Sequence, residues 1–270
     1  MNMKLLLSGL LVGVSVTALA AASLTESTFT EIIKDAKVVA ATTKSATPAQ
    51  TNEVFRVPDL VRTGPDSRVE MTAPDNTITR IGANTVFTFE PLERTIQLKK
   101  GSVLFHAPAG AGGGSIKYHG TAAAVLGTTI ICTVLPDGSF KTLVLEGQGQ
   151  VTLRAGWAVT LNAGEMLTVR PDGNGFGPVM IFGLEDVVSR LQLVNGFSHP
   201  LSSLPLIAAA IQHQNQQIAA GNLGPITSWE VAGKGFGTSD GNGQANSLPA
   251  FLDLRNLGRE SVSPSSPAQP

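Results

Sequence analysis

Between Val54 and Val169, hydrophobic and polar residues alternate with a period of two rather than with the 3.6-residue period of a helix. Successive side chains of a strand point to opposite faces, so each alternating segment predicts a strand with one apolar and one more polar face. The apolar positions of the clearest segments are Val69 and Met71, Ile96 and Leu98, Ile116 and Tyr118, Ile130, Cys132 and Val134, and Val159 and Leu161. The pattern therefore predicts many short strands in this region.

Turn-forming residues separate these segments. Asp75-Asn76 and Asp137-Gly138 stand between alternating runs and predict hairpins, because Asn and Gly accept the positive φ of such turns. No helical pattern lies between the strands. This combination predicts an all-β fold, a jelly-roll or β-solenoid-like sandwich, rather than a parallel α/β sheet.

A weak internal echo links two parts of this region. Leu98–Leu104 resembles Leu161–Leu167, and each segment predicts a strand, a glycine turn and a second strand. Two copies are too few to establish a repeat protein.

The pattern changes to a helical period in the C-terminal third. Leu184, Val187, Val188, Leu191 and Val194 predict one helix, which Gly196 can end. A second helix is predicted from about Ser203, with Pro205 in its first turn and Gly221 past its end. We expect both helices to lie across the β-domain. After Gly221 the chain is rich in Gly, Asn, Ser and Pro, which predicts a disordered tail.

The N-terminus is typical of an export signal. Lys4 precedes the apolar run Leu5–Val16, and two small-x-small patterns follow within Ala18–Ala22. We therefore expect cleavage near residue 22, an extracytoplasmic protein in the periplasm or secreted, and no stable membrane span after cleavage. The alternative is an uncleaved anchor, because Leu5–Ala22 is close to the length of about 20 residues that spans a bilayer.

Composition excludes several classes of function. The 270 residues carry a formal net charge of −1, which argues against a nucleic-acid binder. The single cysteine excludes an internal disulfide, and four histidines with one cysteine leave little material for a zinc site. We expect no metal and no cofactor. Cys132 alternates with Ile130 and Val134, so we interpret it as a small buried hydrophobic residue.

A glycine-rich loop, Gly110–Gly114, joins two predicted strands and is flanked by His106 and His119. It does not have the spacing of a phosphate loop, and a strand rather than a helix follows it. We interpret it as a flexible connection that allows close backbone approach to a partner. The histidines could meet across paired strands, but each occupies a polar position in the alternating pattern of its strand. We therefore expect both to be exposed.

Two observations could indicate an enzyme. Gly237–Gly241 matches the G-x-S-x-G motif, but no strand precedes it and no helix follows it. Paired carboxylates could support a carbohydrate-active enzyme, although spacing does not single out two of the candidates. The candidates are Asp66, Glu70, Asp75, Glu90, Glu93, Glu146 and Glu165. Only Trp157 and Tyr118 of the β-region are suited to stacking on a sugar. We therefore expect a protein that is not an enzyme.

Several segments together resemble the FecR-type domain family. They are Arg62–Met71, Pro74–Thr85, Leu98–Leu104, Gly127–Thr129, Val144–Gly147 and Leu161–Met166. The resemblance implies an all-β extracytoplasmic domain with no catalytic residues and no cofactor. Its motif glycines at 82, 101, 127, 147 and 164 are interpreted as turn makers. We divide the chain into a signal peptide (1–22), a FecR-type β-domain (23–181), a helical extension (182–221) and a low-complexity tail (222–270).

Better-known members of this family are transmembrane regulators with a cytoplasmic anti-sigma segment. No such segment precedes the apolar run here, so the sequence looks more like the secreted, stand-alone members. We expect a non-enzymatic binding or scaffold protein that recognises an envelope protein, peptide or glycan through strand edges or loops. The alternative is a membrane-anchored signal-relay component. The candidate partner-binding residues are Pro108, Gly110, Gly112, Gly113, Gly114, Lys117 and His119.

Overall fold

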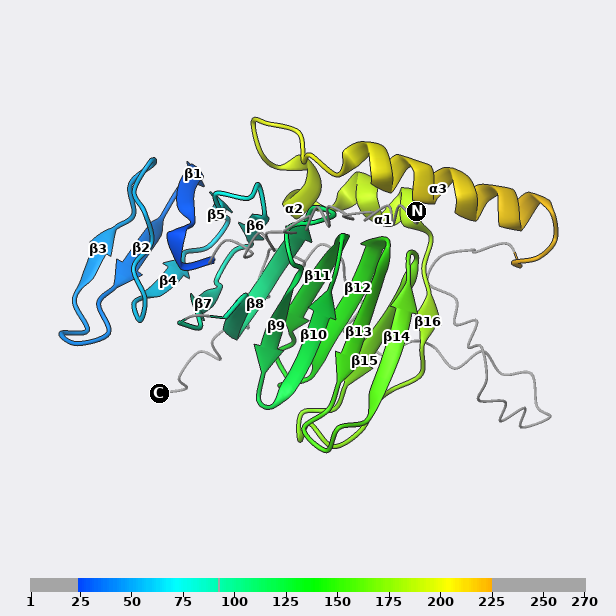
Figure 1. The fold of residues 1–270 in the computed structure, drawn as a ribbon, viewed down its shortest axis with the longest axis horizontal. Coiled ribbons are helices and arrows are strands. Elements are labelled where there is room, and N and C mark those ends of the chain that lie inside the picture. Colours follow the sequence, from blue (N-terminus) through cyan, green and yellow to red (C-terminus); the bar gives the residue numbers. More distant parts are fainter. Residues whose placement is uncertain (1–23, 92, 225–270) are drawn as a thin grey trace, which may run out of the picture.

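The structure, a computed structural model, describes residues 24–91 and 93–224. Within these residues, a short 3-10 helix (Leu24–Glu26) is followed by 16 strands and then by three helices. The strands form two sheets that share one long strand, β8 (Figure 1). The predicted all-β sandwich of short strands is therefore confirmed.

Sheet A contains eight strands of the described chain. Their order is β1 (Thr28–Ile33), β5 (Arg68–Thr72), β6 (Ile78–Ile81), the second half of β8 (Thr95–Ala107), β11 (Thr128–Val134), β12 (Phe140–Glu146), β15 (Glu165–Val169) and β16 (Met180–Ile181). The hairpins β5–β6 and β11–β12 turn at Asn76 and Gly138, which both have positive φ, as Asp75-Asn76 and Asp137-Gly138 predicted.

Sheet B is formed by the remaining strands together with the first half of β8. Its order is β3 (Ala46–Pro48), β2 (Ala36–Val39), β4 (Leu60–Thr63), β7 (Val86–Phe89), the first half of β8, β9 (Gly114–Tyr118), β10 (Thr121–Val125), β13 (Gln148–Thr152) and β14 (Ala158–Asn162). The pairing of β8 with β9 is parallel, and the other strand pairs of both sheets in the described residues are antiparallel.

The chain passes repeatedly between the two sheets, and each passage contains a residue with positive φ. A positive φ turns the backbone sharply, which glycine and, less readily, asparagine or aspartate tolerate. The corner residues are Lys34, Asp66, Asn84, Gly101, Gly110, Gly112, Gly113, Gly127, Gly147 and Gly164. The similarity of Leu98–Leu104 to Leu161–Leu167 is explained in this way, because both segments contain a glycine at which the chain passes from sheet B to sheet A. Gly82 does not have a positive φ; its N–H bonds to the Ser102 carbonyl.

Gly101 shows how tightly these corners are packed. Its φ is +86°, and a Cβ there would lie 2.2 Å from Thr85 Oγ1 and 2.6 Å from Thr85 Cα. Since Cα belongs to the backbone of the neighbouring corner, a side chain at position 101 could not be accommodated by a rotamer change. This glycine is what lets β8 serve both sheets.

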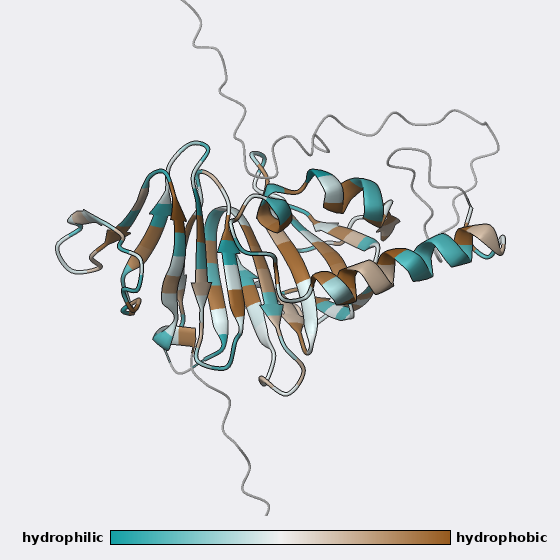
Figure 2. Cartoon of the chain, turned by 90° about the horizontal axis from the view of Figure 1, so that it is seen from above, coloured by the Kyte–Doolittle hydropathy of each residue, from teal (hydrophilic) through white to brown (hydrophobic). Residues whose placement is uncertain are grey.

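The main core fills the space between the two sheets. It holds the inward positions of both, including a cluster of aromatic rings formed by Phe55, Phe87 and Phe89. Figure 2 shows the alternation of hydrophobic and hydrophilic residues along the strands that produces this core. Cys132 lies in it, fully buried, and burial raises the pKa of its thiol to about 12. The interpretation of Cys132 as a small buried hydrophobic residue is therefore confirmed.

A second core covers the outer face of sheet A. The helices α1 (Leu184–Arg190), α2 (Gln192–Asn195) and α3 (Leu204–Ala219) pack there against Leu104, Ile131 and Leu143. Figure 1 shows α3 running across the strands. The expected position of the helices across the β-domain matches this packing, and α3 begins after Ser203 as predicted.

The first predicted helix is wrong in one respect, because it is two helices. Leu191 has an extended backbone (ψ 111°) between α1 and α2. The Asn195 side chain donates to the Val188 carbonyl at 2.6 Å, which satisfies an acceptor at the end of α1. The start of α1 is held by a distant residue, since Gln214 of α3 accepts the Leu184 N–H at 2.9 Å. Periodicity within one segment cannot reveal these partners.

Arg80 anchors the helical part to sheet A. It is fully buried, and its Nε lies 2.7 Å from a carboxylate oxygen of Glu70. Its guanidinium also donates to the carbonyls of Val194 and His199, both at 2.8 Å. The charge is thus shared between a carboxylate of the sheet, a carbonyl at the C-terminal end of α2, where a cation is favourable, and a carbonyl of the segment that follows α2.

Four expectations fall outside the described residues or are not tested by them. Residues 1–22, Gly237–Gly241 and most of the predicted tail lie in the part of the chain that the structure does not describe. The division into domains stays a prediction. Over 24–91 and 93–224, no helix is long and apolar enough for a membrane span.

Candidate binding surfaces

The outer side of β14 is an accessible sheet edge. Within the described residues β14 ends sheet B and pairs only with β13. Ala158 and Thr160 are exposed, whereas Leu161, the residue after Thr160, faces the core. An exposed edge strand presents unpaired N–H and C=O groups to another chain.

The hydrogen bonds of the β13–β14 hairpin show which groups point outward. The Leu153 N–H donates to the Trp157 carbonyl at 2.8 Å, and the Ala163 N–H donates to the Gly147 carbonyl at 3.1 Å. Antiparallel pairs alternate between hydrogen-bonded and non-hydrogen-bonded. These two bonds therefore set the phase: Ala158 and Thr160 direct both their N–H and C=O groups away from β13. We call these four groups the open edge of β14.

The other sheet ends are protected in ways that β14 is not. β1 bonds on its outer side to the segment around Glu53, which accepts the Phe29 N–H at 3.0 Å. β16 has only two residues. On β3, the same phase argument points Pro48 outward, and proline has no N–H to offer. β14 carries no proline, lysine or bulge.

A large hydrophobic side chain stands beside this open edge. Trp157, in the turn before β14, is 73% exposed. The expectation that Trp157 is an accessible platform agrees with this position. The same expectation is wrong for Tyr118, which is buried and stacks on Phe140 with ring centroids 5.9 Å apart.

The predicted partner-binding loop is built largely for packing. Pro108 and Gly114 are half-buried and Gly113 is buried, whereas Ala109, Gly110 and Gly112 are exposed. A Cβ on Gly113 would lie 2.2 Å from the Val125 carbonyl oxygen, and one on Gly114 would lie 2.6 Å from the Phe105 ring. These glycines therefore allow close approach of other parts of the same chain.

Lys117 is engaged within the protein. Its Nζ lies 2.9 Å from a carboxylate oxygen of Glu90 and 3.1 Å from one of Glu93. The hydrogen bond to Glu90 raises the pKa of Lys117, against the opposing effect of burial. Burial acts to raise the pKa of Glu90, but its hydrogen bonds with Glu93, Lys117 and Gln97 outweigh it and lower the pKa.

The two histidines beside this loop lie on different sheets. His106 is buried, so the expectation that it is exposed is wrong. Its Nδ1 lies 2.9 Å from Thr129 Oγ1, and that hydroxyl donates to Glu146 at 2.7 Å and lies 2.8 Å from Ser203 Oγ. The chain leading into α3 covers this polar face of β8, although the alternating pattern predicted that the face contacts solvent. His119 is exposed in the β9–β10 turn and stacks on Tyr118, with centroids 4.2 Å apart.

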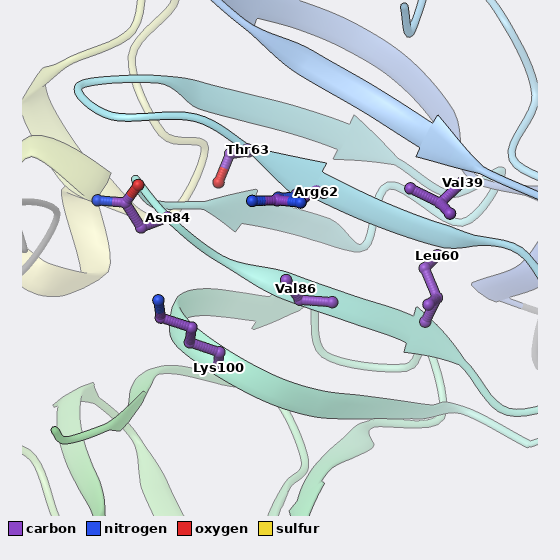
Figure 3. A pocket seen from close by; sticks show the side chains of 7 residues that line it. All are labelled: Val39, Leu60, Arg62, Thr63, Asn84, Val86 and Lys100. Carbon is purple, nitrogen blue, oxygen red and sulfur yellow. The ribbon is translucent and has the colours of Figure 1, made fainter. Parts of the chain in front are cut away.

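A second accessible surface is a hollow on the outer face of sheet B. Its volume is about 260 Å³, and it is lined by Val39, Leu60, Arg62, Thr63, Asn84, Val86 and Lys100. Figure 3 shows Asn84 and Lys100 at one end of the hollow, Val39 and Leu60 at the other, and Arg62 between them. We call this surface the basic hollow. Sequence alternation predicted its strands but not their order, so it was not found from the sequence.

No group of three or more His, Cys, Asp or Glu residues in the described ranges could hold a metal ion. Of the carboxylates named as possible catalytic pairs, Glu70 contacts Arg80, Asp75 contacts Arg94 and Glu146 contacts Thr129.

Comparison with known proteins identifies the class of domain. Residues 59–152 match the family model described as FecR protein. The chain therefore carries a FecR-type domain, which confirms the predicted resemblance. The match runs from the start of β4 to the end of β13, so it includes most of the basic hollow and stops before β14.

Two solved structures are similar to part of this chain. Both are crystal structures of a candidate anti-sigma factor from Parabacteroides distasonis ATCC 8503, at 1.65 and 2.50 Å resolution. Their sequence identities to this chain are 15% and 14%, each with a TM-score of 0.40. The similarity covers 58% of this chain, and 92% and 91% of the two others. Among curated proteins, no sequence matches this chain.

Proposed function

We propose that this protein is a non-enzymatic, extracytoplasmic binding module whose FecR-type domain holds an extended segment of an envelope protein or peptide along β14. The open edge of β14 carries the proposal: two donors and two acceptors, at Ala158 and Thr160, stand in a row on a rigid sheet. A partner strand placed there would extend sheet B and satisfy all four groups.

The edge favours a polypeptide over a glycan. A partner backbone repeats donor and acceptor with the spacing of a strand, which matches the alternating groups of the open edge. Trp157 adds an apolar contact at the start of the strand, of the kind that commonly dominates the binding energy of an interface. The extracytoplasmic location is supported by the apolar run and the cleavage patterns of residues 1–22, which are typical of an export signal.

The proposal is tested by removing one donor from the open edge. Thr160→Pro deletes an outward N–H without touching the bonds to β13, and edge strands tolerate proline at such positions. Thr160→Val is the matched control, because it changes the side chain and keeps the N–H. A photo-crosslinking amino acid at position 157, followed by mass spectrometry of the captured peptides from an envelope extract, reads out binding.

We expect one defined segment to be captured by the unmodified edge and by Thr160→Val. Capture should fall at least about tenfold in Thr160→Pro, since one hydrogen bond is lost and the ring obstructs the next. Equal capture by both variants, with unchanged melting temperatures, would contradict binding at this edge.

The FecR-type domain also favours a second candidate, a signal-relay component anchored through Leu5–Ala22. N-terminal sequencing of the mature protein separates the two. A start near Ser23 excludes the anchor, and an intact Met1 with membrane fractionation excludes export with cleavage.

A further inference from the structure

We infer that a segment of this chain itself, Ile226–Val231, pairs with the open edge of β14 as an added antiparallel strand. The inference rests on the function proposed for this edge and adds its regulation, because an envelope polypeptide then has to displace the segment. Three observations carry it: the place where the described chain ends, the sequence that follows, and the outward groups of the edge.

The described chain ends close to the corner that follows β14. Gln214 of α3 lies against this corner: its Nε2 donates to the Phe182 carbonyl at 2.9 Å, and a Cβ on Gly164 would lie 2.6 Å from the same Nε2. After α3 the chain turns back, since the Leu223 N–H donates to the Gln217 carbonyl at 3.1 Å. Residues three apart are neighbours on a helix surface, so this turn stays near the corner. Figure 1 shows α3 ending on the side of the molecule where β14 and β16 lie.

This starting point sets the direction and the reach of the following chain. β14 runs from the turn at Trp157 to the corner at Gly164, so a chain that starts at the corner and follows the edge runs antiparallel to β14. The segment begins three residues after Leu223 and, when extended, is about 20 Å long. So short a connection keeps its local concentration in about the millimolar range, which favours it over a second copy of the chain.

The sequence of the segment is that of a strand. Four of its six residues are β-branched or aromatic, more than in any other six-residue window of 225–270. The period of two places Thr227, Trp229 and Val231 on one face and Ser228 and Glu230 on the other. The segment therefore has one largely apolar face and one with polar residues.

The phase of the open edge decides how these faces are oriented. Residues directly opposite each other on paired strands lie on the same face of a sheet. The hydrogen-bonding positions of the edge, Ala158 and Thr160, are on the exposed face, so they are opposite polar positions such as Ser228 and Glu230. The apolar face then lies on the side of Val159, which is half-buried and packs against the main core. Pairing thus satisfies the outward groups and extends the core in one register parity.

The test measures hydrogen exchange of single amides by NMR in the full chain. Glu230→Pro removes an N–H that points to β14 in this pairing. We expect the amides of Ala158 and Thr160 to exchange at least about tenfold faster in Glu230→Pro than in the wild type. The Val159 N–H faces β13 in either case, so its exchange is the internal reference and should not change.

Asp240→Pro is the matched control. It also removes one acidic residue and adds one proline, but it lies beyond the segment. It should leave the Thr160 amide as protected as in the wild type. The chain has two tryptophans, at 157 and 229, so a Trp157→Phe background makes Trp229 the only one. Its fluorescence should move to longer wavelength in Glu230→Pro and stay unchanged in Asp240→Pro.

Two results would overturn the inference. One is exchange of the Ala158 and Thr160 amides in the wild type as fast as in Glu230→Pro. The other is protection that survives Glu230→Pro and falls on dilution, which would assign the edge to a second copy. Both leave the capture experiment for envelope polypeptides untouched.

The regulatory part is read from the same capture experiment. With the crosslinker at position 157, Glu230→Pro should capture more of the envelope segment than the wild type or Asp240→Pro. Equal capture by all three would contradict regulation by the segment. Absence of capture from all three, with the exchange results as expected, would contradict envelope binding while the pairing of the segment with β14 stands.

Discussion

Lys141 is a buried amine without a counter-charge among the described residues, and replacing it should stabilise the protein. It lies on β12, on the face of sheet A that carries the second core, and is only 4% exposed. Its neighbours across the sheet are Thr133 and Thr168, and it forms no ion pair within residues 24–91 and 93–224. Burial without a counter-charge lowers the pKa of Lys141 from 10.5 to about 8.

The size and sign of the effect follow from this shift. A pKa lowered by about 2.5 units corresponds to ~3 kcal/mol of cost to the folded state when the amine is protonated. Below pH 8 the amine is protonated in both states, so the full cost applies. Between pH 8 and 10.5 the unfolded state binds more protons, so the contribution of Lys141 to stability improves as pH rises. Lys141→Met should therefore gain ~3 kcal/mol at pH 7, and this gain should shrink toward pH 10.5.

Urea unfolding at pH 7, 8.5 and 10 measures the effect as a difference between the variant and the wild type. The difference is needed because Cys132 acts in the opposite direction. Its thiol loses a proton near pH 9 when unfolded and near 12 when folded, so it destabilises both proteins above pH 9. Lys99→Met, at an exposed position of β8, should change stability by less than about 0.5 kcal/mol. A Lys141→Met protein that is less stable at pH 7, or whose gain is independent of pH, would refute the reasoning.

Three further predictions address the corners, the anchor of the helices and the core. Gly101→Ala should lower the free energy of unfolding in urea by at least about 3 kcal/mol. Gly156→Ala is the control, because Gly156 has nearly the same φ but no atom within 4 Å of the added Cβ, and it should lower that free energy by only about 1–2 kcal/mol. Equal losses would refute a packing role for Gly101. Arg80→Met should cost about 3–5 kcal/mol because it leaves Glu70 charged and buried, and a second change, Glu70→Leu, should recover part of that loss rather than add to it. Cys132 should react with a thiol reagent only at the rate of unfolding, so fast labelling of the native protein would contradict its place in the core.

Local signals in the sequence were sufficient for strands and hairpins between Val54 and Val169, whereas β1, β2 and β3 lie before this region and were not predicted individually. Asp75-Asn76 and Asp137-Gly138 turn the chain as predicted, because the φ that each turn needs is set by the residue itself. Cys132 was placed correctly because its alternation with apolar neighbours is a property of one strand. These features need no knowledge of which strand lies next to which.

The misplaced residues depend on partners far away in the chain. His106 was expected to be exposed because it occupies the polar face of its strand, but the chain leading into α3 covers that face and supplies Ser203. The break at Leu191 depends on contacts made by Asn195 after the break. A period of two identifies two faces of a strand, and it cannot tell whether the second face meets water or another layer.

Both accessible surfaces, the basic hollow and the open edge of β14, arise from strand order, which explains why the sequence did not locate them. The basic hollow needs β2, β4, β7 and β8 side by side, although β3 and the hairpin β5–β6 intervene in the chain. The open edge of β14 exists only because sheet B ends there. Between the two sites lie β9, β10 and β13, so at about 4.8 Å per strand they are more than 10 Å apart. Changes at such separations usually act independently.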